Sequence, residues 1–328
     1  MSSRFSLPGI VATAVVLFAL AAGCHKQEMP VDNPVVVNKA LYDTASNFYV
    51  EFDEYPGQMR NLPIGVFDSG TGGLTVLEKL LSLDRFDNIN GNPGRDSILD
   101  FAGEHFIYLA DQANMPYGNY NAEGNSEYLQ ELVLKDALFL MDDDYFNNAI
   151  EETPSGRKQR VKIIVVACNT ATAYGLDLIR SMLNQTGTGV KVIGVIDAGV
   201  KATLDELDIQ SGDAPFAIGV LATPGTIASG AYEKTLREEL TRRGVTTAVD
   251  IVNQSGYGFA EAVDSDPDYV NPLLFAPRST YRGPALGESD GSIKEELIKA
   301  YNFDFSDNRM LARRSSGGGY ASLQLNSA

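Results

Sequence analysis

The stretch VKIIVVACNTATAYGLDLIRSML, residues 161–183, decides the fold class of this chain. Its first part, 161–167, is mostly apolar and β-branched, which is typical of a strand buried on both faces. The polar residues Cys168 to Thr170 follow at once, and the remainder has the apolar spacing of a helix. A buried strand that passes directly into a helix predicts a parallel sheet covered by helices.

The same alternation of apolar strand and amphipathic helix recurs along the chain. Strands are expected at 61–67, 105–110, 161–167, 190–196, 216–222 and 247–252, and helices at 72–83, 126–141, 170–183, 198–207 and 225–243. We therefore predict an α/β fold with doubly wound parallel sheets.

Both ends of the chain differ from this body. The apolar run 10–23 follows Arg4 and has the length of a signal-peptide core, and the sequence LAAGC that ends at Cys24 resembles a bacterial lipobox. We expect 1–23 to be a lipoprotein signal peptide and Cys24 to carry the lipid, with an uncleaved N-terminal anchor as the alternative. Either would hold the body on a membrane of the bacterial cell envelope, outside the cytoplasm.

Two further segments lack the strand–helix alternation. Residues 24–60 are polar, contain several prolines and are expected to be a tether, with one short packed segment at 48–52. Residues 266–328 are rich in Pro, Gly and Ser, and we expect an insertion followed by a disordered tail.

Composition excludes several classes of function. The 43 acidic residues against 26 basic ones give a net charge of −17, which argues against nucleic acid as a partner. Two cysteines and two histidines are too few for a disulfide framework or a structural zinc site, so no metal is expected.

Polar clusters follow four of the predicted strands. They are DSGTGG at 68–73, DQANMPYG at 111–118, CNT at 168–170 and TPGT at 223–226. Ligands of open parallel sheets bind outside the carboxyl ends of the strands, so these clusters predict one shared crevice. DSGTGG fits neither the phosphate loop nor the dinucleotide fingerprint. A glycine-rich turn with Asp68 as a helix cap is the alternative for it.

Cys168 has two readings. A lone cysteine that ends an apolar strand is most often a small core residue. A helix begins directly after Cys168, however, and a helix N-terminus lowers the pKa of a thiol. The agreement among four strand ends favours a functional thiol.

Five segments resemble, in order, the motifs of the cofactor-independent aspartate/glutamate racemase family. They are IGVFDSGTGGLTVLEKL, YLADQANMPYG, IVVACNTATAYGL, VIGVIDAG and IGVLATPGTIASGAYEKTL, and the resemblance runs from about 62 to 265. It implies two α/β domains, 61–197 and a partial 198–265, that face each other across a crevice. We place a hinge between them near 196–199.

The resemblance also implies roles for single residues. Cys168 matches one of two opposed cysteines that move the α-proton of an amino acid without any cofactor, and Asp68 matches the aspartate that assists it. Eight positions match residues that hold the substrate: Ser69, Pro116, Tyr117, Gly118, Asn169, Thr170, Thr223 and Thr226. The expected reaction interconverts L- and D-glutamate. Aspartate as substrate and a homodimeric assembly remain open.

Three departures from the family are visible. No cysteine follows Cys168, and nothing matches the family's Gly-Cys-Thr-His segment. Ser255 stands where a second family segment has cysteine, and its acidic partner is either Glu261 or Asp264. The family's D-glutamate normally feeds cell-wall precursors made in the cytoplasm, whereas this chain is expected outside. A non-catalytic, membrane-anchored binder of acidic amino acids is therefore the alternative function, followed by a lyase or isomerase with a single cysteine.

Overall fold

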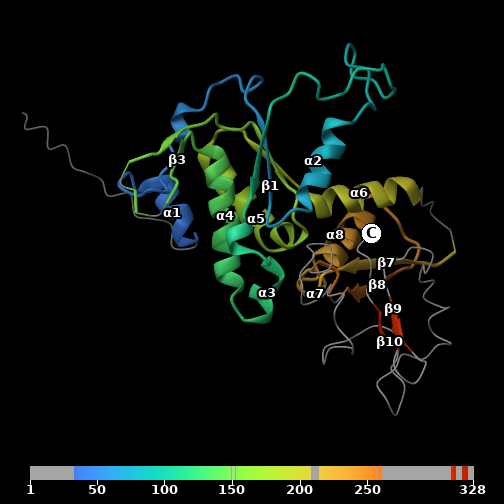
Figure 1. Ribbon diagram of the computed structural model, residues 1–328. Helices are drawn as coiled ribbons and strands as arrows, with labels where there is room; N and C mark the ends of the chain where they lie inside the picture. Colours follow the sequence, from blue (N-terminus) through green and yellow to red (C-terminus); the bar gives the residue numbers. More distant parts are fainter. Residues whose placement is uncertain are drawn as a thin grey trace, which may run out of the picture.

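The computed structural model describes residues 33–148, 150–151, 153–207, 214–256, 258–260, 312–314 and 320–323 (Figure 1). The predicted signal peptide, the lipid site at Cys24 and the acidic candidates Glu261 and Asp264 lie outside the described residues.

A four-stranded parallel sheet forms the centre of the first unit. It contains β1 (Ile64–Asp68), β2 (Phe106–Ala110), β5 (Ile163–Val166) and β6 (Lys191–Gly194) in the order β2-β1-β5-β6. The predicted parallel sheet is confirmed, and each strand lies within a few residues of its expected position. Because β1 has β2 and β5 as its neighbours, the polar clusters that follow these three strands meet at one edge.

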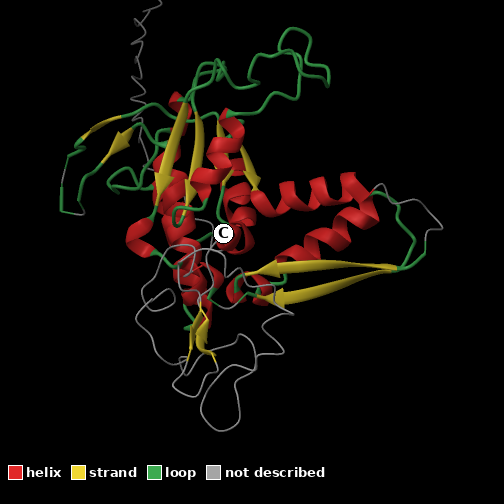
Figure 2. Cartoon of the chain, turned by 45° about the vertical axis from the view of Figure 1, so that its right-hand side comes forward, coloured by secondary structure: helices red, strands yellow, loops and turns green. Residues whose placement is uncertain are grey.

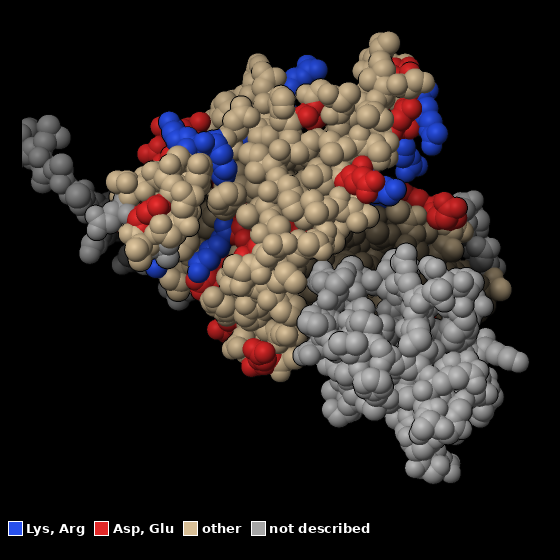
Figure 3. All heavy atoms as spheres, in the orientation of Figure 1, with Lys and Arg blue, Asp and Glu red and all other residues tan. Residues whose placement is uncertain are grey.

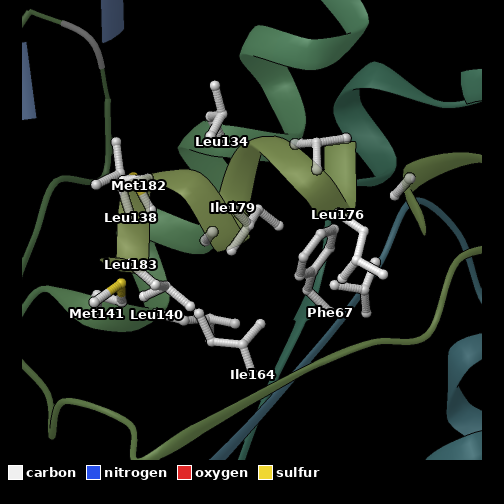
Figure 4. Close-up of a cluster of buried hydrophobic side chains, with 14 of the residues drawn as sticks. Phe67, Leu134, Leu138, Leu140, Met141, Ile164, Leu176, Ile179, Met182 and Leu183 are labelled. Carbon is white, nitrogen blue, oxygen red and sulfur yellow. The ribbon is translucent and has the colours of Figure 1, made fainter. Parts of the chain in front are cut away.

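Helices cover both faces of this sheet. The helices α3 (Tyr117–Ala122), α4 (Ser126–Met141) and α5 (Asn169–Thr186) lie on one side, and α2 (Gly73–Leu81) lies on the other (Figure 1). Phe67 points into the core shared with α4 and α5, whereas its neighbour Val66 joins the smaller cluster beneath α2 (Figure 4). This alternation is the period of two that a strand imposes on its side chains.

The helices α4 and α5 approach each other closely at a glycine. A Cβ atom on Gly175 would lie 2.2 Å from Cγ1 of Val133, so no larger residue fits there without movement of the helices. The packed core between the two helices sets where α5 begins, and therefore where Cys168 stands.

The tether expected at 24–60 is wrong where the helix α1 (Val35–Tyr42) lies, whereas the short packed segment expected at 48–52 is confirmed by the burial of Val50. The helix α1 packs against α4, and the short helix η1 (Phe52–Glu54) follows it. Val36, Val37 and Val50 are buried in the main core cluster. The apolar residues of α1 recur at helical spacing, so they can be buried together against the outer side of α4. This burial stabilises the folded state, whereas a polar tether would have no apolar face to bury.

A second unit is built on two parallel strands, β7 (Phe216–Ala222) and β8 (Val249–Ser255). The helices α6 (Val195–Leu207) and α8 (Ala231–Arg242) cover one face of this pair, as Figure 2 shows. On the other face Leu221 and Val252 are 62% and 52% exposed. Among the described residues this second sheet is therefore covered by helices on one side.

Two helix boundaries differ from expectation. The single helix predicted at 225–243 is two helices, α7 (Pro224–Ala228) and α8, because Gly230 adopts a left-handed φ of 65° between them. The hinge predicted near 196–199 is wrong, since these residues lie inside the continuous helix α6. β6 passes directly into α6, and Asp197 in its first turn pairs with Arg180 of α5.

Smaller elements complete the described chain. β3 (Asp144–Tyr145) and β4 (Gly156–Arg157) form one antiparallel pair. β9 (Ala312–Arg314) and β10 (Tyr320–Leu323) form another, so this part of the predicted disordered tail is wrong. Acidic and basic side chains lie close together on the face drawn in Figure 3. No described helix is long and apolar enough to cross a membrane.

Candidate active site

The carboxyl ends of β1 and β5 bring two predicted residues together. Ser69 directly follows β1, Cys168 follows β5, and the Ser69 Oγ lies 3.2 Å from the Cys168 Sγ. The strands hold this geometry through their ladder, in which the Ala167 amide donates to the Phe67 carbonyl at 2.8 Å. Two residues 99 positions apart are thus neighbours because their strands are paired.

Asp68 contacts both the 68–73 turn and the neighbourhood of Cys168. Its side chain is buried, and Oδ2 accepts a hydrogen bond from the Gly73 backbone N–H at 2.7 Å, where α2 begins. A Cβ on Gly73 would lie 2.5 Å from the Asp68 Cβ, so this turn needs glycine there. Gly72 stands at the N-cap position of α2 and has no side chain to accept a hydrogen bond, so the Asp68 carboxylate accepts from the first helical N–H in its place. Its charge also raises the pKa of the Cys168 thiol, and the catalytic role of Asp68 stays a prediction.

Cys168 is the N-cap of α5, and its Sγ accepts from the Ala171 backbone N–H at 3.4 Å. Burial and the nearby Asp68 carboxylate raise the pKa of the Cys168 thiol, while hydrogen bonds from Ser69 and Ala171 lower it. The net direction is upward, so the lowered pKa expected at a helix N-terminus is not found. The thiol is 7% exposed, and the loss of water outweighs the helix dipole.

We predict that Asp68→Asn shifts the alkylation of Cys168 to lower pH. The thiolate is the reactive form, and removing a neighbouring negative charge lowers the pKa of the thiol. Iodoacetamide rates measured against pH on the Cys168 peptide by mass spectrometry give the midpoint. Asp177→Asn, at an exposed position of α5, is the matched control and should leave it in place. An unchanged or higher midpoint in Asp68→Asn would contradict the prediction.

The second unit contributes hydroxyl groups to the same place. Thr223 caps α7 by accepting from the Thr226 backbone N–H at 3.4 Å. The Thr226 hydroxyl is buried and lies 3.3 Å from the hydroxyl of Thr170, in the first turn of α5. Tyr174, one turn further along α5, donates to the Gly225 carbonyl at 3.2 Å. These contacts join the strand ends of the two sheets, as the four polar clusters predicted.

The turn 115–118 lies beside α7 and begins with a cis Met115–Pro116 peptide bond. Gly118 is in contact with Gly225, where an added Cβ would lie 3.0 Å from the Gly118 carbonyl oxygen. The Tyr117 side chain is 1% exposed and its hydroxyl binds Asp111 and Asp136. Only the backbone of Tyr117 is therefore available for the predicted contact with substrate.

Asn169 and Ser255 occupy the margin of the site. Asn169 is exposed, and its Oδ1 accepts from the Tyr232 hydroxyl of α8 at 2.8 Å. Ser255 pairs with Ala222 at the carboxyl end of the β7–β8 sheet. All ten predicted catalytic and substrate residues are described and lie at strand ends or helix starts. The described residues contain no group of three His, Cys, Asp or Glu that could hold a metal ion.

Sequence reasoning missed four residues that contact either a predicted residue or the polar clusters 68–73 and 223–226: Tyr108, Asp136, Tyr174 and Tyr232. Tyr108 of β2 lies against the 68–73 turn, with its hydroxyl 3.5 Å from the Gly70 carbonyl oxygen. Burial and the Asp68 charge raise the pKa of Tyr108 to about 12. Each of the four lies within a strand or helix whose spacing indicates only packing. The sequence carries no signal for these long-range contacts.

Together, fold and site define an α/β protein with a cysteine thiol and a carboxylate at the ends of parallel strands. No protein-family model matches the sequence. The chain is 30% identical over 222 residues to glutamate racemase of Gloeothece citriformis (strain PCC 7424), covering 66% of this chain and 62% of that one. It is 35% identical over 177 residues to glutamate racemase of Aquifex pyrophilus, covering 54% and 51%. The chain is therefore similar to members of the aspartate/glutamate racemase family over part of their length.

Solved structures give weaker overlaps. Glutamate racemase from Campylobacter jejuni subsp. jejuni aligns with a TM-score of 0.40 at 28% identity, over 62% of this chain and 60% of that one. A glutamate racemase isoform from Bacillus anthracis aligns with a TM-score of 0.41 at 26% identity, over 64% and 59%. The chain spans roughly half to three fifths of the curated relatives named above.

Proposed function

We propose that this protein is a cofactor-independent amino-acid racemase that acts on the α-carbon of glutamate. The observation that carries the proposal is the meeting of Cys168, Ser69 and Asp68 at the ends of β1 and β5. The names of the curated relatives support glutamate as the substrate. Aspartate is the nearest alternative, since the two amino acids differ by one methylene group.

Cys168 is the proposed acid/base. As a thiolate its Sγ removes the α-proton, and as a thiol it returns a proton to the same face. Asp68 and Ser69 adjust the balance between the two forms, one raising and the other lowering the pKa of Cys168. The α-proton of an amino acid is a very weak acid, so its removal needs donors already in place around the developing charge. The proposed donors are the hydroxyls of Thr170 and Thr226 and the backbone N–H groups of the 115–118 turn.

Inversion needs a second acid/base on the opposite face, because a single base tends to return the proton to the side it came from. The sequence has no cysteine after Cys168. A protein with one working thiol would exchange the α-proton for solvent with little inversion. We therefore expect these 328 residues, assayed by themselves, to exchange the α-proton faster than they racemise glutamate.

A second candidate function is a non-catalytic binder of acidic amino acids that uses the same residues. The upward shift of the Cys168 pKa favours it, because a thiol that stays protonated is a poor base. In this alternative the hydroxyl groups and backbone N–H groups would hold the ligand and Cys168 would only line the site.

One experiment separates these functions. The full chain is incubated with L- and D-glutamate, and separately with L- and D-aspartate, in heavy water. Deuterium at the α-carbon is followed by mass spectrometry, enantiomers by chiral chromatography, and binding by calorimetry. Exchange or inversion of glutamate supports the racemase, whereas binding without either supports the binder. If none of the four amino acids binds or reacts, both proposals are wrong.

We further propose that the protein is held at a membrane of the bacterial cell envelope by a lipid on Cys24. The support is the sequence alone, with its apolar run 10–23 and the residues LAAGC. The full chain expressed in bacteria should then sediment with membranes, and Cys24→Ser should move it to the soluble fraction or leave it unprocessed. Cys168→Ser serves as the matched control and should stay with the membrane. Sedimentation of Cys24→Ser with membranes after its signal peptide has been removed would contradict the lipid anchor.

A further inference from the structure

The helix α4 carries a buried carboxyl group that the proposed mechanism does not use. Asp136 lies in the interior of α4 and is 8% exposed, among the apolar residues of the main core. Burying an ionised carboxylate in such a place is costly unless the charge is neutralised or well partnered. Asp136 therefore needs an explanation.

The number of protons available around the Tyr117 hydroxyl explains how Asp136 can be buried. The Tyr117 hydroxyl oxygen lies 2.6 Å from Oδ2 of Asp111 and 2.7 Å from Oδ2 of Asp136. A phenol has one proton and can donate it to only one of these oxygens. The other contact needs a proton on the carboxyl group, or two lone pairs would face each other at hydrogen-bond distance.

The surroundings decide which carboxyl group holds that proton. Asp111 accepts from the Asn114 side-chain amide at 2.8 Å and 3.0 Å, as an ionised carboxylate does. Asp136 is the more deeply buried of the two. Burial raises the pKa of Asp136 to about 8, the hydrogen bond with Tyr117 acts in the opposite direction, and the Asp111 charge adds to the increase. The order of donation is therefore from Asp136 to Tyr117 and from Tyr117 to Asp111.

The groups that face Asp136 support this assignment. Tyr117 of α3 and Asp111 after β2 are the titratable groups that act on it among the described residues. The other elements packed on α4 add apolar side chains to its core: α1 contributes Val37, α5 contributes Ile179, and β1 contributes Phe67. Among the described residues no cation acts on Asp136, and the hydrogen bond with Tyr117 is the contact that favours its charged form.

We propose that Asp136 is a protonated positioning residue that fixes Tyr117, and with it the 115–118 turn of the candidate active site. The importance of the turn for substrate rests on the proposed function. The chain of contacts starts in the core on α4 and passes through Tyr117 of α3. It ends at Gly118, which lies against Gly225 of α7 beside Thr226. Asp136 acts on the site through Tyr117 and touches no substrate itself.

The first test is the pH dependence of stability in Asp136→Asn, which is neutral and can still donate to Tyr117. The unfolded carboxyl loses its proton near its ordinary pKa of about 3.9, whereas the folded one keeps it up to about 8. Asp136 therefore stabilises the folded protein fully at low pH, and this contribution is lost as pH rises toward about 8. The melting temperature of Asp136→Asn, relative to the unchanged chain, should rise steadily between pH 5 and pH 8.

Asp177→Asn is the matched control, because Asp177 lies on α5 with its side chain 74% exposed. Its melting temperature relative to the unchanged chain should vary little with pH. A flat or falling difference for Asp136→Asn over the same range would overturn the protonated state. Infrared spectra give a second reading: the carbonyl band of a protonated carboxylic acid at pH 7 should be lost in Asp136→Asn and kept in Asp177→Asn.

The second test asks whether Asp136 positions the turn. Asp136→Leu keeps a similar shape but cannot donate, whereas Asp136→Asn can. Hydrogen–deuterium exchange of the peptide that covers 115–118 should be about fivefold faster or more in Asp136→Leu, as expected for a lost buried hydrogen bond. In Asp136→Asn it should stay close to that of the unchanged chain. Equal protection in both variants would overturn the positioning role.

Binding of glutamate then separates this inference from the proposed function. If the chain binds glutamate, Asp136→Leu should bind it about fivefold more weakly or worse and Asp136→Asn should restore the affinity. Equal affinity of Asp136→Leu and the unchanged chain would overturn the link to the site. If the unchanged chain binds no acidic amino acid, the proposed function fails, and the exchange and stability measurements still decide the state of Asp136.

Discussion

Replacing Cys168 with serine is expected to slow α-proton exchange of glutamate by about 10²- to 10⁴-fold, the usual contribution of a positioned acid/base. A serine hydroxyl is a far weaker acid than a thiol, so it forms no useful anion near neutral pH. The fold should survive, because serine is a favoured N-cap and can accept from the Ala171 backbone N–H as Cys168 does. The loss would therefore report chemistry and leave stability nearly unchanged.

The measurement is deuterium uptake at the α-carbon from heavy water, for both enantiomers of glutamate. Cys24→Ser is the matched control, since it makes the same atomic change at the other cysteine of the chain. It should exchange at the rate of the unchanged protein. If Cys168→Ser keeps that rate too, Cys168 is not the acid/base. Cys168 would then be interpreted as a small core residue.

Replacing Phe67 with alanine is expected to lower the free energy of unfolding by about 3–5 kcal/mol. Phe67 is fully buried in the central strand β1, where it fills the core between the sheet and the helices α4 and α5 (Figure 4). Deleting its ring removes apolar burial and leaves a cavity in the packed core, which relaxes only in part. Domains of this kind are stable by about 5–15 kcal/mol, so the change would remove a large part of the total.

Urea unfolding followed by circular dichroism measures this loss. Phe86→Ala is the matched control, because Phe86 is 46% exposed in the loop after α2, and its replacement should change stability by less than about 0.5 kcal/mol. Similar losses in the two variants would show that the core does not lie where β1 places it. Since Asp68 is the next residue in the strand, we also expect Phe67→Ala to loosen the position of Asp68 in the candidate active site.

Strong periodicity explains which elements could be predicted. The helix at 126–141 and the strand at 216–222 were predicted at the positions where α4 and β7 lie. Both have an unbroken apolar pattern with polar residues on each side, so local sequence alone sets their type and length. The strand ends were predictable for the same reason, and with them the polar clusters that form the candidate site.

Local pattern failed where a distant contact decides the structure. The segment 35–42 is a helix because α4 offers it an apolar surface, although its neighbours in sequence are those of a tether. The break at Gly230 depends on how α7 turns toward α8, and a helical spacing runs across it without interruption. Neither the surface of α4 nor the turn at Gly230 can be predicted from the local residues whose structure depends on it.

The sequence by itself determined the α/β class, the parallel strands and the chemistry placed at their ends. These follow from apolar periodicity and from residue type, which act over a few neighbouring positions. Only the tertiary structure decided the state of the ionisable groups. Burial beside Asp68 raises the pKa of Cys168 against the effect of its helix, and the Tyr117 hydroxyl places a proton on Asp136. Desolvation and hydrogen bonding depend on what surrounds a group in space, and chain neighbours do not reveal that.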